Sequence, residues 1–314
     1  MGKEVGVTTL PIRQVRFDLD GDDIPFLWNP DNPAFSLQLN VVSLIAISFE
    51  KFIVAAVSEA LPLIQDPAVR AEAHSFLEQE AQHASWHRQH VRALTRRWPG
   101  MVNVLSGAIG CFDELTERTP LRFRLAYIAD LEATFTPWFK LLLDNDRVLF
   151  GGGDDRVASL FLWHFVEEVE HRSSGLVIYD AVVSNRWYRT LVLPLVLRHM
   201  NRLVTIIAEG LNVAVPESDR VVDARVILPK VAVQDQLRRV PWLGRRLRDV
   251  PVVPDCYEGV PGKERGAAGR GVLVSQTPYH DPAHQPLPQF ASRWFESYEA
   301  GGDIAHWYRG AKVR

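Results

Sequence analysis

The sequence predicts an all-α protein built on a four-helix bundle. Four long segments between residues 32 and 183 start with helix-capping signals and continue as apolar or amphipathic stretches. Two of them each contain a Glu-x-x-His pair, whose two side chains share one face of a helix. The 314 residues are 47% hydrophobic and 23% charged, so the chain can bury a sizeable core. These features favour a bundle with ionisable side chains at its centre.

The first two helices are predicted from an asparagine or aspartate followed by proline. Asn32 and Pro33 begin a helix through SLQLNVVSLIAISFEKFIVAAVSEAL, which is apolar nearly all round and therefore buried. Glu50 lies in its middle and needs a partner. Asp66 and Pro67 begin a second, more polar helix that ends near a Trp-Pro-Gly sequence.

The next two helices follow the same logic. A Thr-Pro pair precedes a third helix, LRFRLAYIADLEATFTPWFKLLLDN, in which apolar residues enclose Glu132. Asp154 or Asp155 caps a fourth helix that we expect to continue to about Val183. Residues 101–118, between the second and third helices, are ambiguous and fit one short helix and a turn.

Three regions are expected: an extended N-terminal arm (1–31), the helical bundle (32–210) and a C-terminal extension that docks on the bundle (211–314). A further helix is predicted over about 187–209. Within the extension, residues 221–240 fit short strands or a helix, and PGKERGAAGRG reads as a flexible linker.

Composition limits the partners and the compartment. A net charge of −3 and a pI near 6.4 give no general attraction to nucleic acid. Cys111 and Cys256 are too few for a disulfide framework. The most membrane-like run, residues 190–208, is interrupted by Arg198 and Arg202, so no integral membrane span is expected. A cytoplasmic protein is predicted.

The ionisable residues of the four helices fall into two matching halves. The halves read Glu50, then Glu80 and His83, and Glu132, then Glu168 and His171. Each gap between the first and second glutamate, 30 residues and 36 residues, fits one helix remainder, a loop and half of an antiparallel helix. The four carboxylates can therefore meet at one level of the bundle and, with the two imidazoles, cage two metal ions.

Oxygen and nitrogen ligands of this kind suit two iron ions, with manganese as the alternative. Without cations, four acids in an apolar core would repel one another and lose solvation, so their burial itself argues for bound metal.

Four other histidines are weighed against this centre. His164 stands one turn before Glu168 on the same helix face, which makes it a third histidine ligand or else a packed core histidine. His87 shares the stripe of the second helix and supports a ligand or simply packs. His74 and His90 are expected on a solvated face.

With these residues identified, the chain resembles the ferritin-like di-iron carboxylate proteins. Its RFDL, QEAQH and WHFVEEVEHR elements, over most of residues 12–190, are similar to those of the bacterial predicted metal-dependent hydrolases. The ligand spacing with His164 added is similar to that of the di-iron arylamine N-oxygenases, in which an additional histidine binds metal. Gln79 and Glu167 stand where that pattern usually has aspartates, which orient the partner histidines.

The resemblance implies a ferritin-like bundle with extra helices and an irregular extension. It implies an O2-dependent di-iron oxygenase acting on a small apolar or aromatic substrate, such as an aryl amine, with an external electron donor. Apolar residues would then wall off the substrate pocket: Phe49, Ile53, Phe135, Trp138 and Trp163. The alternative is a hydrolase in which two metals activate a water. Iron storage is a weaker option, and homodimerisation stays open.

Overall fold

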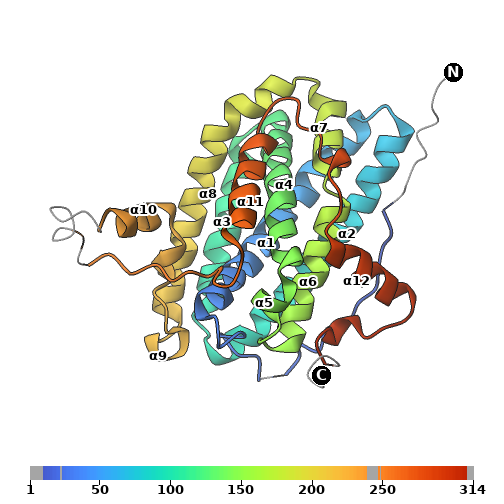
Figure 1. Cartoon of the computed structure of the whole chain (residues 1–314). Helices are drawn as coiled ribbons and strands as arrows, with labels where there is room; N and C mark the ends of the chain where they lie inside the picture. Colours follow the sequence, from blue (N-terminus) through green and yellow to red (C-terminus); the bar gives the residue numbers. More distant parts are fainter. Residues whose placement is uncertain (1–9, 22, 239–246, 248, 310–314) are drawn as a thin grey trace.

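The computed structural model describes residues 10–21, 23–238, 247 and 249–309, and within them it is helical without a strand (Figure 1). The α-helices are α1 (Pro33–Ala60), α2 (Pro67–Arg97), α3 (Met101–Arg118), α4 (Leu121–Asp144), α5 (Asp146–Phe150), α6 (Asp155–Glu170), α7 (Ser174–Val183), α8 (Arg186–Ala214), α9 (Glu217–Arg220), α10 (Pro229–Leu237), α11 (Gly262–Ser275) and α12 (Gln289–Glu299). Short 3-10 turns are η1 (Leu61–Leu63), η2 (Ala224–Ile227), η4 (Pro282–His284) and η5 (Ile304–His306). The predicted all-α class is confirmed.

Four helices close a ring around the centre of the molecule. Helix α1 packs along α2 and against α4, while α6 packs against both α4 and α2. These are the four helices that carry the predicted ligand residues. Their closure brings residues from distant parts of the chain to one core.

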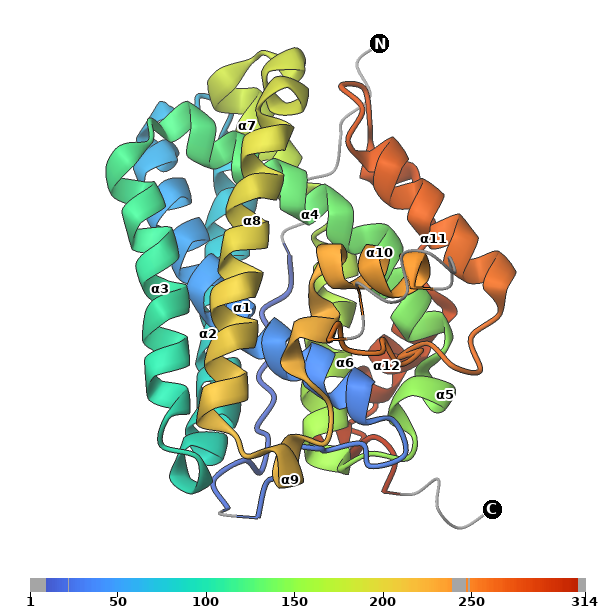
Figure 2. The same ribbon diagram turned by 90° about the vertical axis from the view of Figure 1, so that its left-hand side faces the viewer.

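The remaining helices cover this ring. Helices α3 and α8 pack together and lie against α1, and α8 also contacts α4 (Figure 2). Helix α11 lies along α4, and α12 contacts α4 and α6. The C-terminal part of the chain therefore returns to the second half of the bundle.

Three of the four predicted helix starts are confirmed by side-chain hydrogen bonds, and the fourth, that of α4, follows Pro120 without one. The Asn32 side chain accepts from the backbone N–H of Phe35 at 3.1 Å, and Asp66 accepts from Ala68 at 2.8 Å. Asp154 caps α6 by accepting from the backbone of Arg156 at 3.0 Å. Each cap satisfies N–H groups that have no partner inside the helix.

The predicted fourth helix is broken in two, which corrects the expectation of one helix to about Val183. Helix α6 ends at Glu170, and α7 begins at Ser174 after a short turn. The residues between the two helices are His171, Arg172 and Ser173, and α7 begins with Ser174 and Gly175; serine and glycine are both poorer helix formers than alanine. The break leaves His171 at the end of α6, where it is the C-cap residue.

Three other expectations need correction or sharpening. The linker prediction at 261–271 is wrong, because residues 262–271 lie in α11 and Pro261 is its N-cap. The ambiguous segment 101–118 is one continuous helix, α3. Residues 221–238 contain η2 and α10 and no strand, and residues 239–240 lie outside the described part.

The described part of the N-terminal arm, from residue 10 onward, runs extended over the bundle. Val15, Phe17 and Leu19 are buried while the residues between them are exposed. The Phe17 ring packs against Trp86 of α2 and Trp163 of α6, with ring centroids 5.3 Å and 5.5 Å apart. The arm thus covers the seam between these two helices.

Two stretches of the described chain are long and apolar enough to cross a membrane by length and composition alone. One is α1 with η1, and 67% of its most apolar window is buried inside the bundle, as in a core helix. The other is α8, whose window is 28% buried. Neither is a clear membrane span. Location in the cytoplasm stays a prediction.

Candidate metal centre

The bundle brings six of the seven predicted ligand residues into two overlapping groups. The first cluster is made of Glu50, His83, His164 and Glu168, and the second cluster is made of Glu80, His83, Glu168 and His171. Within each cluster, one potential ligand atom per residue lies within 4.8 Å of the others. All six side chains are buried. This buried site could hold two metal ions.

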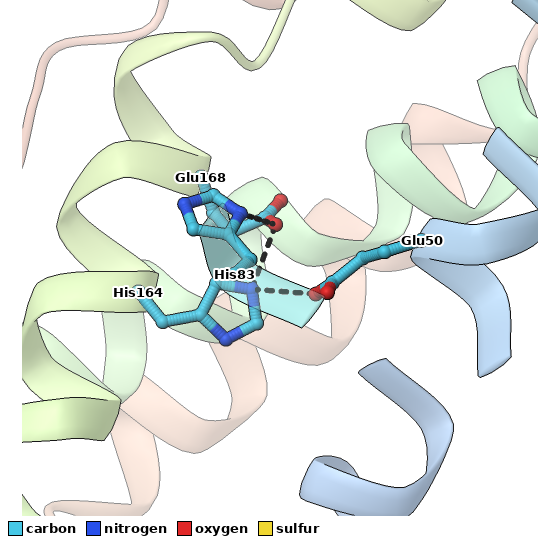
Figure 3. A group of neighbouring side chains, drawn as sticks. All are labelled: Glu50, His83, His164 and Glu168. Carbon is cyan, nitrogen blue, oxygen red and sulfur yellow. Dashed lines mark hydrogen bonds and ion pairs between the residues drawn. The ribbon is translucent and has the colours of Figure 1, made fainter. Parts of the chain in front are cut away.

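The first cluster centres on a ring nitrogen of His164. Its Nε2 lies 2.9 Å from Oε1 of Glu168 and 3.4 Å from Oε1 of Glu50. His83 enters from α2, with its Nδ1 3.6 Å from the same Glu168 oxygen. Figure 3 shows the two imidazoles and the two carboxylates converging from α1, α2 and α6.

The second cluster centres on His171. Its Nε2 lies 3.4 Å from Oε1 of Glu80 and 3.8 Å from Oε1 of Glu168. Glu132, the seventh predicted residue, belongs to neither cluster, although its Oε2 lies 3.7 Å from Nδ1 of His171. Its carboxylate therefore stands at the edge of the centre, next to the second cluster.

Many polar atoms of this centre are buried without a hydrogen-bond partner, which is a strong departure from ordinary protein cores. They are Oε2 of Glu50, both carboxylate oxygens of Glu80 and Glu132, Oε2 of Glu168, Nδ1 of His83 and both ring nitrogens of His171. Carboxylate oxygens and imidazole nitrogens are the donor atoms that iron, manganese and zinc accept. The residues present therefore fit a pair of bound cations.

The electrostatics of the protein alone point the same way. Burial, reinforced by the neighbouring carboxylates, raises the pKa of Glu50, Glu80 and Glu168 well above the ordinary value, and burial raises that of Glu132 to about 8. Burial lowers the pKa of His83 to about 3. Two divalent cations would offset the charge of four ionised carboxylates, lower the pKa values of these carboxylates again and accept the neutral imidazole as a ligand.

Most of the chain matches a known protein family. Residues 11–240 match the model of a family described as predicted metal-dependent hydrolase. The chain belongs to this family. The match covers the whole helical ring and every residue of both clusters. No curated protein and no solved structure matches the chain.

Membership of the hydrolase family overturns the sequence-based choice of a di-iron oxygenase. That choice was wrong because carboxylate and imidazole ligands do not fix the reaction, and the same pair of metals can activate O2 or water. The expected N-oxygenation, O2 co-substrate and electron donor lose their basis with it. The alternative weighed from the sequence, a metal-dependent hydrolase, is the one that the family match supports.

The two residues expected to orient the histidines behave differently. Glu167 Oε2 lies 3.0 Å from Nε2 of His83, which leaves Nδ1 of that ring facing the clusters. Gln79 makes no such contact with His171 and instead donates to the carbonyl of Pro11 in the arm at 3.0 Å. A hydrogen-bonded carboxylate fixes both the orientation and the tautomer of an imidazole. Only one of the two Glu-x-x-His histidines has this support.

His164 has a different support, made of buried polar side chains. Its Nδ1 lies 2.7 Å from Nε2 of His87, whose Nδ1 lies 2.9 Å from the hydroxyl of Ser43. His90 contacts the same hydroxyl at 2.9 Å. The expectation that His90 is solvated is wrong, because it is fully buried. Of the two interpretations left open for His87, its contact with His164 favours the supporting one. Ser43 was missed; its signal is a serine two turns before Glu50 on an apolar helix.

Aromatic rings pack around the histidines of the centre. Trp163 packs on His83 and Phe76 on His171, each with centroids 5.0 Å apart, and Phe139 packs on His164 at 6.2 Å. Phe49 and Phe135 pack edge to face at 6.1 Å. Of the five residues predicted to form the apolar wall, Trp163 packs on a histidine of the centre, and Phe76 and Phe139, which also do so, were not among those five. His74 is exposed, as expected.

Proposed function

We propose that this protein is a hydrolase that uses two divalent cations held at the centre of the bundle. The proposed ligands are the seven residues predicted from the sequence: Glu50, Glu80, His83, Glu132, His164, Glu168 and His171. The observation that carries the proposal is that Glu168 and His83 belong to both clusters, so the two proposed cation positions would lie next to each other, and the one inward nitrogen of His83 would serve one of them. We further propose that α1, α2, α4 and α6 adopt a ferritin-like arrangement.

Each part of the site has a role in this reaction. Bound cations would supply a Lewis acid for the scissile carbonyl or phosphoryl group and lower the pKa of a water. Glu167 and His87 hold the rings of His83 and His164 so that one nitrogen of each faces inward. Trp163, packed on His83, keeps bulk water away. The chain's contribution is thus a fixed, dry set of donor atoms.

The metal is proposed to be iron or manganese, with zinc also compatible with the donor atoms. Oxygen-rich ligand sets favour iron and manganese, and the described site has no cysteine among its donors. Four carboxylates also match the total charge of two divalent ions. The identity of the metal follows from loading the protein with each ion and comparing activity.

The substrate is proposed to carry an apolar acyl or aryl part. A cavity of about 300 Å³ opens between α1, α8 and residues 253–257, and mostly aliphatic side chains line it. Trp138 lines it too, and its neighbour Phe139 packs on His164. The polar corner of the cavity is the Tyr257 hydroxyl, which accepts hydrogen bonds from Trp138 and Gln38.

The test is hydrolysis by protein loaded separately with Zn²⁺, Mn²⁺ or Fe²⁺. Esters and anilides of increasing acyl length serve as substrates, with metal content measured on the same samples. We expect activity to require two bound ions and to disappear with a chelator. Glu168→Gln, which alters a residue of both clusters, should lower both metal content and activity by at least about 100-fold, since removing an outer partner alone costs 10–100-fold.

Glu78→Gln is the matched control, because it makes the same chemical change on an exposed position of α2. We expect this variant to keep wild-type metal content and activity. Two bound ions without hydrolysis in any loaded form would contradict the hydrolase proposal. A protein that binds no divalent ion would remove the metal centre as well.

A further inference from the structure

Arg13 of the N-terminal arm joins two acidic residues behind the metal centre. Its guanidinium donates to both carboxylate oxygens of Glu170, at 2.7 Å and 2.8 Å, in a two-pronged pair. The same Nη1 lies 3.5 Å from Oε1 of Glu167. The Arg13 side chain is only 11% exposed and that of Glu167 is 1% exposed. Two-pronged arginine–carboxylate pairs in such surroundings fix geometry as well as charge.

The opposite side of Arg13 faces the aromatic rings of α12. The guanidinium carbon lies 4.5 Å from the ring centre of Phe295 and 5.9 Å from those of Trp294 and Tyr298. The Tyr298 hydroxyl also accepts a hydrogen bond from the backbone N–H of Gln14 at 3.1 Å. A cation held between carboxylates and aromatic faces has few alternative orientations. Helix α12 therefore holds the arm in place.

Glu167 connects this arrangement to the metal centre. One of its oxygens lies 3.0 Å from His83 Nε2, and the other faces Arg13. His83 lies where the two clusters overlap, and its one inward nitrogen, Nδ1, can bind a cation at one of the two proposed positions, so the orientation of its ring affects the metal centre. The contacts thus run from α12 through Arg13 and Glu167 to a histidine of the metal centre.

We propose that Arg13 is a positioning residue for the metal centre and that α12 is the element that holds it there. The inference rests on the proposed metal centre but not on which reaction it performs. Helix α12 lies outside residues 11–240, the part matched by the family model. A segment beyond the family's common region therefore sets the affinity of this chain for its metals.

The experiment compares metal affinity in Arg13→Ala and Arg13→Lys, using metal-free protein and competition with a chromophoric chelator for Zn²⁺ and Co²⁺. We expect Arg13→Ala to bind about 10–100-fold more weakly, the range for loss of an outer partner of a ligand. The visible spectrum of bound Co²⁺ should change, because the His83 ring is less constrained. Arg13→Lys should recover only part of the affinity, since lysine cannot make the two-pronged contact.

Arg293→Ala is the matched control. Arg293 also lies on α12, packs on the Phe290 ring at 5.4 Å and pairs with Asp146 at 3.2 Å, but none of these contacts leads to Glu167. We expect this variant to keep wild-type metal affinity and Co²⁺ spectrum even where its stability falls. A merely structural role for Arg13 would make the two arginine variants behave alike.

A milder variant covers the case in which Arg13→Ala does not fold. Phe295→Leu removes the ring beneath Arg13 and keeps an apolar side chain, and we expect a few-fold loss of affinity with the same direction of spectral change. If Arg13→Ala folds and keeps the wild-type metal affinity and Co²⁺ spectrum, the inference about Arg13 is wrong. If only Phe295→Leu folds, the same result in that variant overturns the inference. Neither result affects the hydrolase proposal. Absence of metal binding in the wild type overturns both the inference and the hydrolase proposal.

Discussion

His83 and His171 occupy corresponding places in the two Glu-x-x-His segments, yet their surroundings differ. His83 lies within a continuous helix and has the Glu167 carboxylate behind it at 3.0 Å. His171 lies at the end of α6, and neither of its ring nitrogens has a hydrogen-bond partner in the described structure. Gln79, which could have supported it, contacts the arm instead.

The two clusters are therefore not equivalent. The first cluster contains two imidazoles held from behind, His83 by Glu167 and His164 by His87. The second cluster shares His83, but its other imidazole, His171, has no such support. Since an outer hydrogen bond raises metal affinity, we expect the first position to bind its ion more tightly than the second.

The largest effect should follow from removing both ions. In the metal-free protein, burial raises the pKa of Glu132 from its ordinary value of 4.5 to about 8. The contribution of this group to the free energy of unfolding is therefore complete below pH 4.5 and is lost as the pH rises through 8. His83, lowered to about 3, contributes stability above its ordinary 6.5 that is lost as the pH falls through 3. Between pH 4.5 and 6.5 a rising pH therefore lowers the contribution of Glu132 to stability and raises that of His83. Above pH 6.5 only the loss from Glu132 remains.

We therefore expect the free energy of unfolding of chelator-treated protein to fall between pH 6.5 and 8. With cations bound, the carboxylates are ionised in the folded state, so the fall should largely disappear. Urea unfolding at pH 6.5, 7.2 and 8, with and without metal, measures both slopes. A metal-free protein that is equally stable at pH 6.5 and 8 would contradict the idea that the centre needs cations.

The second prediction separates the two clusters. His164→Ala should abolish the tighter position and leave weak binding of one ion, while His171→Ala should leave one ion bound with nearly wild-type affinity for the first position. Calorimetric titration of metal-free protein reports both stoichiometry and affinity. Equal effects of the two substitutions would show that the unequal support of the histidines does not matter. They would also remove the basis for ordering the two positions.

The third prediction compares residues behind the histidines. His87→Ala should weaken binding at the first position by about 10–100-fold, because it removes the partner of His164 Nδ1. Gln79→Ala is the matched test on the other half, and we expect little change in metal affinity because Gln79 contacts Pro11 rather than His171. Chelator competition measures both. If Gln79→Ala weakened metal binding strongly and His87→Ala did not, the second cluster and not the first would have the better-supported histidine.

The sequence was sufficient for residues whose local pattern carries the signal. Acids isolated in apolar helices at helical spacing, such as Glu50 and Glu168, could be predicted to meet because burial of such groups needs partners. His164 could be placed beside Glu168 because residues four apart share a helix face. Their role as ligands stays a prediction.

Other features depend on contacts between distant segments. Arg13 and Glu167 lie 154 positions apart in the sequence, and no local sequence pattern predicts their pairing. Residues 261–271 have the glycine content of a loop, but α11, which contains most of them, packs along α4. Gly271 lies so close to Pro137 that an added Cβ would be 2.7 Å from the proline ring. The glycine permits close packing of two helices rather than flexibility.

The smallest effect concerns the break between α6 and α7. A Cβ at Gly175 would lie 3.0 Å from Cγ and 3.3 Å from Cβ of Glu132, and both glycine and glutamate are buried, so neither can easily move away. Gly175→Ala should therefore displace Glu132 from beside His171, destabilise the protein by roughly 1–3 kcal/mol and weaken the second metal position a few-fold.

Gly110→Ala makes the same change in α3, on an exposed position with no atom within 4 Å of the added carbon. There the greater helix propensity of alanine should stabilise the protein by about 0.5–1 kcal/mol. Thermal unfolding and metal titration of both variants measure the contrast. If Gly175→Ala stabilised the protein as Gly110→Ala is expected to, the space beside Glu132 would not be filled, and the close approach of this carboxylate would not be the reason for a glycine at this position.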